Sequence, residues 1–192
     1  MLTWRSLVIC LVALAGCGGE AAPQWTPPPA PKIDDPSLIP VPIGPTAAYV
    51  PEAHSPATGC TPGAVQGRYR AHIELFAHRH AIVIPAGIGL QQPRLDELGR
   101  IDAADCRSAI RTLDPTGVVH FDRADLTLDD LFRTWRQPYG ANSLLSFRGP
   151  TEVFVAGKRA SGAIPLADGA QIVVELGGFI PPHPSFTFPP RG

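Results

Sequence analysis

The stretch IRTLDPTGVVHFD, residues 110–122, decides the fold that the sequence predicts. Its middle, D-P-T-G at 114–117, places Asp at position i, Pro at i+1 and Gly at i+3 of a type I turn, and the glycine can adopt a left-handed bulge conformation. The turn joins two short runs, 110–113 and 118–122, that suit strands. We therefore expect a β-hairpin here.

An amphipathic helix is expected shortly after this hairpin. Thr127 fits the N-cap position, with Asp130 three residues later as its reciprocal hydrogen-bonding partner. Apolar residues at positions i, i+3, i+4 and i+7 form one stripe: Leu128, Leu131, Phe132 and Trp135. Because proline does not continue a helix, we expect this one to end before Pro138.

Four more strands are predicted outside the hairpin. Polar and apolar residues alternate along 68–76, as in a strand with one buried face. The apolar run 81–84 stops at a proline, and we expect it to pair with the first strand through a turn at 78–80. Two later strands are expected at 152–156 and 171–176.

The order of hairpin, helix and two strands predicts an α+β domain of β-grasp type. In this fold a sheet of hairpins is crossed by one amphipathic helix, and Phe132 and Trp135 would lie in the core. The pattern of 95–109 is ambiguous and admits a short helix broken near Gly99.

The N-terminus predicts where the protein resides. Arg5 precedes an apolar run at 6–14, and L-A-G-C at 14–17 looks like a bacterial lipobox. We expect 1–16 to be a lipoprotein signal peptide and Cys17 to carry the lipid, which would anchor the protein to a bacterial membrane in the cell envelope, with its domain outside the cytoplasm. The alternative is a signal anchor with a coincidental Cys17, but the apolar run is shorter than the ~20 residues that span a bilayer.

Residues 17–57 are expected to be a disordered, proline-rich linker. P-P-P-A-P at 27–31 and I-P-V-P at 39–42 favour polyproline II, which makes a semi-rigid spacer. A ligand for a proline-reading module is the other interpretation. Residues 58–192 are then a single α+β domain.

Charge and cysteine usage restrict the partners. With 16 Lys+Arg against 17 Asp+Glu, the net charge of −1 gives no reason to expect a nucleic acid. Cys10 lies in the signal peptide. Cys60 and Cys106 remain in an exported chain, so we expect them to form a disulfide. A two-thiolate metal site is the alternative, but the spacing is wide and C-x-x-C is absent.

A polar face is expected around the central hairpin. His120 should lie across from Arg111 and share its face with Asp122, and neighbouring polar positions would extend the surface. The candidate binding face comprises Arg68, Arg70, His72, Arg111, Asp114, His120 and Asp122. His72, His120 and Asp114 (or Asp122 in its place) are acceptable ligands for Cu²⁺ or Zn²⁺, although the arginines would repel a cation.

The sequence evidence for other kinds of site is weaker. His78 and His80 suit either a weak metal site or a solvated turn, and the turn is favoured. Ser143 or Ser146 can be combined with His120 and Asp114 into a triad only on paper, because no G-x-S-x-G surrounds either serine. P-loop, dinucleotide and H-E-x-x-H motifs are also absent, so we do not expect an enzyme.

Several motifs occur in an order that resembles an uncharacterised family of exported bacterial and archaeal proteins, many of them lipoproteins. They are the two cysteines, I-P-A-G-I-G-L at 84–90, G-V-V-H-F-D at 117–122 and the apolar positions of 126–135. The family pattern is HxHAHL, IPAxIGI, C, HTHD, GIIHVE and TLxxFFxxWG. The resemblance covers most of the region from Cys60 to the C-terminus.

The departures from that pattern concern its histidines. This chain has R-Y-R-A-H-I at 68–73 and R-T-L-D at 111–114. Only His72, Asp114 and His120 survive of what looks like a histidine-rich metal site in the relatives. The resemblance thus implies that this member binds metal poorly or not at all, and that the substituted face is cationic.

Two functions follow from these observations. We expect a non-enzymatic binding or accessory domain, without a cofactor, that presents its cationic face to an unknown protein or a small anionic ligand such as a carboxylate or phosphate. The alternative is a Cu- or Zn-binding envelope protein that uses His72, His120 and Asp114.

Overall fold

The computed structural model describes residues 38–43, 46–53, 59–97, 99–181 and 186–190, with side chains from residue 51 onward. The expected signal peptide, the lipidated Cys17 and the linker as far as residue 37 lie outside these residues. The described residues contain no helix with the length and hydrophobicity of a membrane span.

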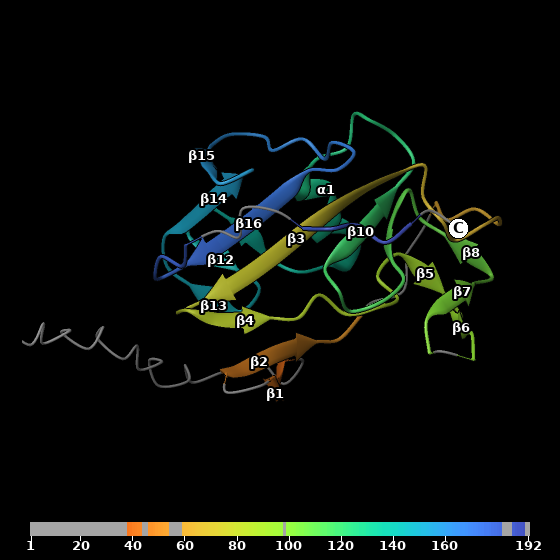
Figure 1. Cartoon of the computed structure of the whole chain (residues 1–192), viewed down its shortest axis with the longest axis horizontal. Coiled ribbons are helices and arrows are strands. Elements are labelled where there is room, and N and C mark those ends of the chain that lie inside the picture. The colour runs from red at the N-terminus through yellow and green to blue at the C-terminus, as the bar shows by residue number, and fades with distance from the viewer. Residues whose placement is uncertain (1–37, 44–45, 54–58, 98, 182–185, 191–192) are drawn as a thin grey trace, which may run out of the picture.

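One mixed sheet of nine strands forms the centre of the described chain (Figure 1). Its main path runs in the order β1 (Leu38–Ile43), β2 (Thr46–Pro51), β4 (His80–Ile82), β3 (Tyr69–Ala77), β16 (Gln171–Leu176), β14 (Thr151–Val155) and β15 (Lys158–Ala160). β3 pairs in parallel with β16 and antiparallel with β4. The first half of β3 also pairs with β10 (Val118–Phe121), which in turn pairs with β9 (Ile110–Thr112).

The helix α1 (Leu128–Trp135) covers the face of the sheet that is turned away from the viewer in Figure 1. Thr127 donates its backbone N–H to Asp130 Oδ2 at 2.9 Å, as the capping pattern predicts. All four residues of the predicted apolar stripe are buried in one core cluster with Ile73 and Val174. The helix ends at Arg136, which takes a left-handed conformation before Pro138.

The central hairpin forms as predicted, with Arg111 opposite His120. Gly117 adopts φ +80°, and a side chain there would put Cβ 2.5 Å from the carbonyl oxygen of Ile73 on the neighbouring β3. The glycine of the D-P-T-G turn therefore both closes the hairpin and lets it lie against β3. The strands expected at 68–76, 81–84, 152–156 and 171–176 correspond to β3, β4, β14 and β16, so the α+β class is confirmed.

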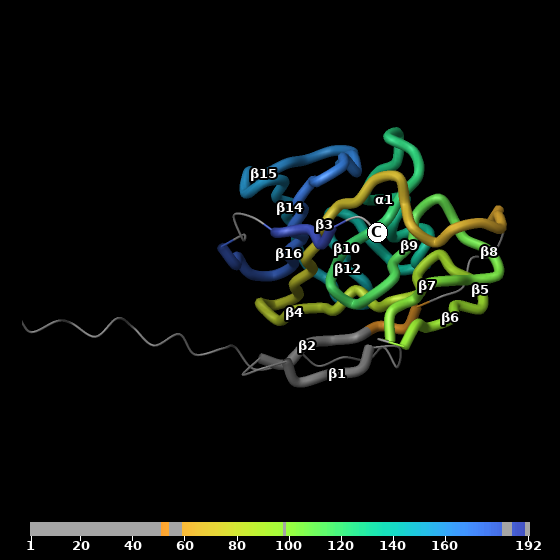
Figure 2. Tube along the Cα trace, turned by 45° about the vertical axis from the view of Figure 1, so that its right-hand side comes forward, coloured from red at the N-terminus to blue at the C-terminus, as the bar shows by residue number. Residues whose placement is uncertain are grey.

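The short helix admitted for 95–109 is wrong. This stretch instead contains two small strands, β7 (Ile101–Ala103) and β8 (Cys106–Arg107). They pair with β6 (Arg94–Leu95) and β5 (Leu90–Gln91), at one end of the molecule away from β14 and β15 (Figure 2). Asp96 closes a turn by accepting the backbone N–H of Arg100 at 2.8 Å, with Gly99 at φ +77°. A side chain that binds backbone in this way competes with the helix.

The predicted disulfide between Cys60 and Cys106 is confirmed, with the two Cα atoms 5.4 Å apart. It ties the segment before β3 to β8, and Thr61 exchanges backbone hydrogen bonds with Arg107 beside it. Ile101 and Leu113 pack with Val65 and Leu90 in a second small core cluster beneath this end of the molecule. The region around the disulfide is thus packed against the hairpin that carries His120.

The expected linker 17–57 contains two strands, so the sheet begins at Leu38, well before the expected domain start at 58. β2 joins β4 through Tyr49 and Ile82. Pro40 and Pro42 alternate along the edge strand β1, where proline can face away from the ladder and lose no hydrogen bond. The indole of Trp135 donates to the carbonyl of Glu52 at 3.1 Å, which fixes the end of this segment to the core.

The chain between α1 and β14 forms a separate three-stranded sheet of β11 (Tyr139–Gly140), β12 (Ser143–Leu144) and β13 (Phe147–Arg148). On the side opposite α1, the C-terminal segment 186–190 passes across β3 in front of the sheet (Figure 1). This segment reaches the polar face on which the candidate site lies.

Candidate functional site

Three basic side chains form a row across neighbouring strands. Arg70 on β3 is the register partner of His120 on β10, and His120 is the partner of Arg111 on β9. Since directly opposite residues in an antiparallel pair lie on the same face of a sheet, the imidazole stands between two guanidinium groups. The row is the structural basis of the polar face expected from the sequence.

Arg111 is closed to a ligand. Its side chain has no exposed surface, and its Nη atoms bind Asp122 Oδ1 and Oδ2 at 2.9 Å each. Nη2 also donates to the carbonyl of Gln66 at 2.7 Å, Nη1 to that of Ser108 at 3.1 Å, and Nε to that of Val65. All five donors of a guanidinium are thus used within the protein.

Asp122 is more exposed than Arg111, but its carboxylate is engaged by two arginines. Burial tends to raise the pKa of this carboxyl, but hydrogen bonds and charge from Arg111 and Arg107 outweigh burial and lower it. Arg107 Nη1 also pairs with Asp122 Oδ2. The Arg111–Asp122 cluster, defined as these two residues with Arg107, therefore holds the loop 65–67 on the sheet and does not extend the accessible cationic face expected from the sequence.

His120 has one free ring nitrogen. The side chain is 6% exposed, and Nδ1 accepts the backbone N–H of Gly67 at 3.3 Å. A Cβ on Gly67 would lie 2.8 Å from His120 Cβ, so the glycine permits this approach. In the neutral imidazole the proton is then assigned to Nε2, which has no partner among the described residues.

The charge state of His120 follows from its surroundings. Burial, followed by the positive charges of Arg111 and Arg70, lowers its pKa to about 4, against weaker opposing effects of Asp114 and Asp122. The imidazole is neutral at pH 7, and its Nε2–H is a hydrogen-bond donor at the wall of a cavity that His120 lines.

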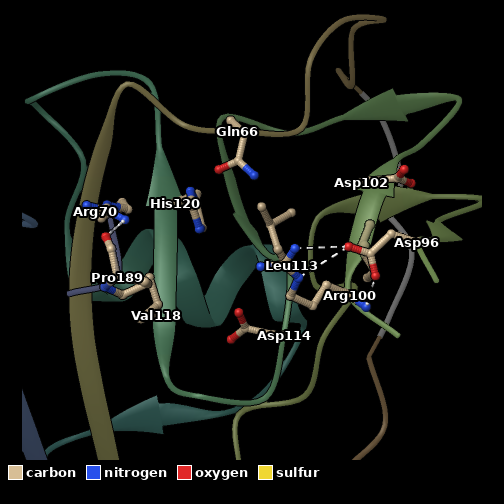
Figure 3. A pocket seen from close by; sticks show the side chains of 11 residues that line it. Gln66, Arg70, Asp96, Arg100, Asp102, Leu113, Asp114, Val118, His120 and Pro189 are labelled. Carbon is tan, nitrogen blue, oxygen red and sulfur yellow. Dashed lines mark hydrogen bonds and ion pairs between the residues drawn. The ribbon is translucent and has the colours of Figure 1, made fainter. Parts of the chain in front are cut away.

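A cavity of about 250 Å³ opens next to this imidazole (Figure 3). Its floor contains the buried side chains of His120, Leu113, Val118 and Ile101. Arg70 and the carbonyl of Pro189 lie at one side, the Arg100–Asp96 pair lies at the other, and further polar groups stand around the rim: Gln66, Asp102 and Asp114. We call this cavity the His120 pocket.

The two arginines of the pocket differ in their partners. Arg100 Nε lies 3.2 Å from Asp96 Oδ2, so its charge is compensated. Arg70 is half-buried, and no carboxylate of the described residues pairs with its guanidinium. Its Nη1 donates to the carbonyl of Pro189 at 2.8 Å, and Nε is buried without a partner. Arg70 is the basic group in the pocket whose charge is left for a ligand.

The other predicted residues lie outside the pocket or at its rim. Asp114 uses Oδ1 to accept the backbone N–H of Thr116 at 3.0 Å. His72 donates Nε2–H to the carbonyl of Thr116 at 3.1 Å and does not line the pocket. Arg68 is exposed above the ring of Tyr69, 5.2 Å from its centroid. Among the described residues no group of three metal-ligating side chains gathers, and the copper or zinc interpretation remains a prediction.

The minor candidates are separated from the pocket. His78 lies in the turn between β3 and β4 as expected, but His80 is 3% exposed and belongs to β4 rather than to a solvated turn. Ser143 lies on β12 in the three-stranded sheet, and neither it nor Ser146 lines the cavity next to His120.

Sequence reasoning missed three parts of the site. The i, i+4 pair Asp96–Arg100 around Gly99 is a turn pattern that could have placed Arg100, but nothing local relates that turn to His120. The loop at Gly67 and the C-terminal Pro189 reach the site through backbone atoms, which side-chain patterns do not reveal. No protein-family model, curated protein or solved structure matches the chain.

Proposed function

We propose that the folded domain is a non-enzymatic binding domain that takes a small anionic ligand, a carboxylate or phosphate, in the His120 pocket. The observation that carries the proposal is that the imidazole of His120 and the guanidinium of Arg70 line one cavity, where, among the described residues, Nε2 has no partner and Arg70 has no carboxylate partner. Because this N–H can donate and His120 lines the cavity, an oxygen of a bound ligand could accept it.

The chemistry of the two donors is complementary. A guanidinium binds carboxylate or phosphate oxygens through a planar pair of N–H groups, so Arg70 would supply charge and direction. The neutral imidazole of His120 would supply a second donor without a further charge. Asp102 and Asp114 at the rim would oppose a highly charged anion, so a ligand with one acidic group fits best.

The setting of the domain is part of the same proposal. The lipobox at 14–17 supports anchorage through a lipid on Cys17 to a membrane of the cell envelope, with the domain outside the cytoplasm. The Cys60–Cys106 disulfide is compatible with an oxidising compartment. The parallel neighbours β3 and β16, flanked by antiparallel β4 and β14 with α1 on one face, support the β-grasp proposal.

Binding of copper or zinc is the second candidate, favoured by one observation: His120 Nε2 and the Asp114 carboxylate line the same cavity. His72 lines a different cavity and is turned to Thr116. Arg70 beside the imidazole opposes a cation. We therefore place this function behind anion binding, and a Zn²⁺ or Cu²⁺ titration of wild type and His120→Ala tests it directly.

The test of anion binding is a titration of residues 18–192, followed by backbone amide NMR. Inorganic phosphate and acetate are the probes, and sodium chloride at equal ionic strength is the control. We expect saturable shifts at Gly67, His120 and Arg70 that are lost in Arg70→Met and kept in Arg68→Met, because Arg68 is exposed and outside the pocket. Shifts that do not saturate, or that are equal in both variants, would contradict the proposal.

A further inference from the structure

The C-terminal segment 186–190 is seated on the outer face of β3, the face opposite α1. The ring of Phe186 stacks on that of His72, with centroids 3.7 Å apart and planes 6° from parallel. The ring of Phe188 lies beneath the guanidinium of Arg70, 5.5 Å from its Cζ to the ring centroid. Two aromatic rings are therefore each paired with one polar side chain of the same strand.

The spacing of these pairs is regular. His72 and Arg70 are two residues apart on β3, so their side chains lie on one face about 7 Å apart. Phe186 and Phe188 have the same spacing, and the segment runs antiparallel to β3 because Phe186 meets His72 while Phe188 meets Arg70. Thr187 between them is exposed. An extended Phe-x-Phe peptide matches this strip side chain by side chain.

Backbone contacts add to the side-chain match. Gln171 Nε2 donates to the carbonyl of Phe186 at 3.3 Å, and Arg70 Nη1 donates to that of Pro189 at 2.8 Å. The two aromatic rings also contact each other edge to face, with centroids 5.1 Å apart. Contacts to both side chains and backbone carbonyls are the usual means by which a protein binds an extended peptide.

We propose that the outer strip of β3 formed by His72 and Arg70, with Gln171 on β16, is a docking surface for a Phe-x-Phe-Pro peptide segment, and that the chain's own residues 186–189 occupy it in cis. Since Arg70 also lines the His120 pocket, the segment competes with an anionic ligand for the same guanidinium. Only this competition rests on the proposed function, because the docking contacts stand without it.

The docking surface is tested with a chain that ends at Pro181 and a fluorescent peptide of residues 185–192, SFTFPPRG, by fluorescence anisotropy. We expect saturable binding to the shortened chain. Full-length protein should bind the peptide at least ~10-fold more weakly, because its own segment is present at a high effective concentration. Arg70→Met in the shortened chain, or alanine at both phenylalanines of the peptide, should abolish binding, and alanine at Thr187 of the peptide should not.

Absence of saturable binding to a shortened chain that keeps the amide spectrum of the folded protein would overturn the docking surface. Equal binding by full-length and shortened chains would overturn occupation in cis. If the shortened chain does not fold, full-length Phe186→Ala/Phe188→Ala replaces it, because both rings lie on the outer face, away from the α1 core cluster. That variant should bind the peptide at least ~10-fold more tightly than the matched full-length Thr187→Ala, whose own segment still occupies the surface.

Competition is measured separately by titrating inorganic phosphate into full-length Phe188→Ala and Thr187→Ala. We expect phosphate to bind Phe188→Ala several-fold more tightly, while Thr187→Ala behaves as wild type. Equal affinities in the two variants would overturn competition. Peptide binding without phosphate binding in any variant would overturn the proposed function and uphold the docking surface, so the two failures are distinguishable.

Discussion

Arg111 and Arg70 lie on opposite sides of the same imidazole, yet their surroundings differ completely. Arg111 is fully buried, and its guanidinium donates hydrogen bonds to Asp122 and to three backbone carbonyl groups. Arg70 is half-buried and pairs with no carboxylate of the described chain; its guanidinium donates to the carbonyl of Pro189 and lies over the ring of Phe188. The first side of the row holds the fold together, and the second leaves donors facing a cavity.

The difference shows that a shared strand face does not give its residues a shared role. Arg111 and Arg70 are equivalent by register, since both are partners of His120. What separates them is the loop at Val65 and Gln66, whose carbonyls cover Arg111 and leave Arg70 open.

Replacing the structural arginine should give the largest effect. Arg111→Met leaves the carbonyls of Val65 and Gln66 without their donor and removes one of the two arginine partners of Asp122, which keeps Arg107, so we expect the free energy of unfolding to fall by about 3–4 kcal/mol. Urea unfolding followed by circular dichroism measures it, with exposed Arg68→Met as the control. A loss no greater than that of Arg68→Met would contradict the structural role of the Arg111–Asp122 cluster.

Lowering the pH should decrease the free energy of unfolding, because the fold holds His120 in its neutral form. Its pKa is about 4 in the folded state and 6.5 when unperturbed, so the unfolded state binds a proton first as the pH falls. The part of the stability that depends on His120 should be constant well above pH 6.5 and decrease by about 3 kcal/mol as the pH falls from 6.5 to 4.

The measurement is the free energy of unfolding at half-unit pH steps, for wild type and His120→Gln. The glutamine variant should have a markedly flatter profile between pH 6.5 and 4, because it lacks the group that titrates there. The low pKa of the Asp122 carboxyl places its own loss of stability below this window. Identical profiles for the two proteins would show that His120 is not held neutral by the fold.

Replacing Arg70 should lower ligand affinity much more than it lowers stability. Arg70→Met removes one hydrogen bond and one cation–π contact at a half-buried site, so we expect a stability loss of about 1 kcal/mol or less. Phosphate affinity should fall at least ~10-fold, since a charge-assisted contact is lost. Calorimetric titration beside the unfolding measurement checks both. A large stability loss with unchanged affinity would reverse the assignment of the two arginines.

Replacing Asp114, the carboxylate at the rim of the pocket, should have the smallest effect on phosphate affinity. Asp114→Asn keeps an oxygen that can accept the Thr116 N–H but removes a negative charge from the pocket. We expect phosphate to bind about twofold more tightly at low salt, and the gain to shrink at 0.5 M salt, where charges are screened. Weaker binding, or a gain that salt does not reduce, would place the anion away from this rim.

Local patterns predicted the elements that depend on neighbouring residues. The D-P-T-G turn gave the hairpin and hence the pairing of Arg111 with His120, and the Thr127–Asp130 pair located the start of α1. Local patterns failed where a segment distant in sequence determines the secondary structure. β1 and β2 are proline-rich strands that form by joining β4, and the turn at Asp96–Arg100 replaced an expected helix.

The candidate site was also predicted only in the part that depends on local sequence patterns. His120 and Arg70 were identified because strand alternation puts them on one face, and that face exists. Whether each side chain is open depends on backbone atoms from Val65, Gly67 and Pro189, which are far away in sequence and carry no side-chain pattern. Burial of Arg111 and exposure of the pocket therefore required the structure.

The binding role of His120 and Arg70 is tested most directly by the ¹⁵N NMR spectrum of the His120 imidazole during a phosphate titration at pH 7. We expect a neutral ring with its proton on Nε2, and a saturable shift of that N–H in wild type and Arg68→Met but not in Arg70→Met. A protonated ring, a proton on Nδ1, or an Nε2–H that does not respond to phosphate in the wild type would contradict the claim that His120 and Arg70 form the binding side of the row.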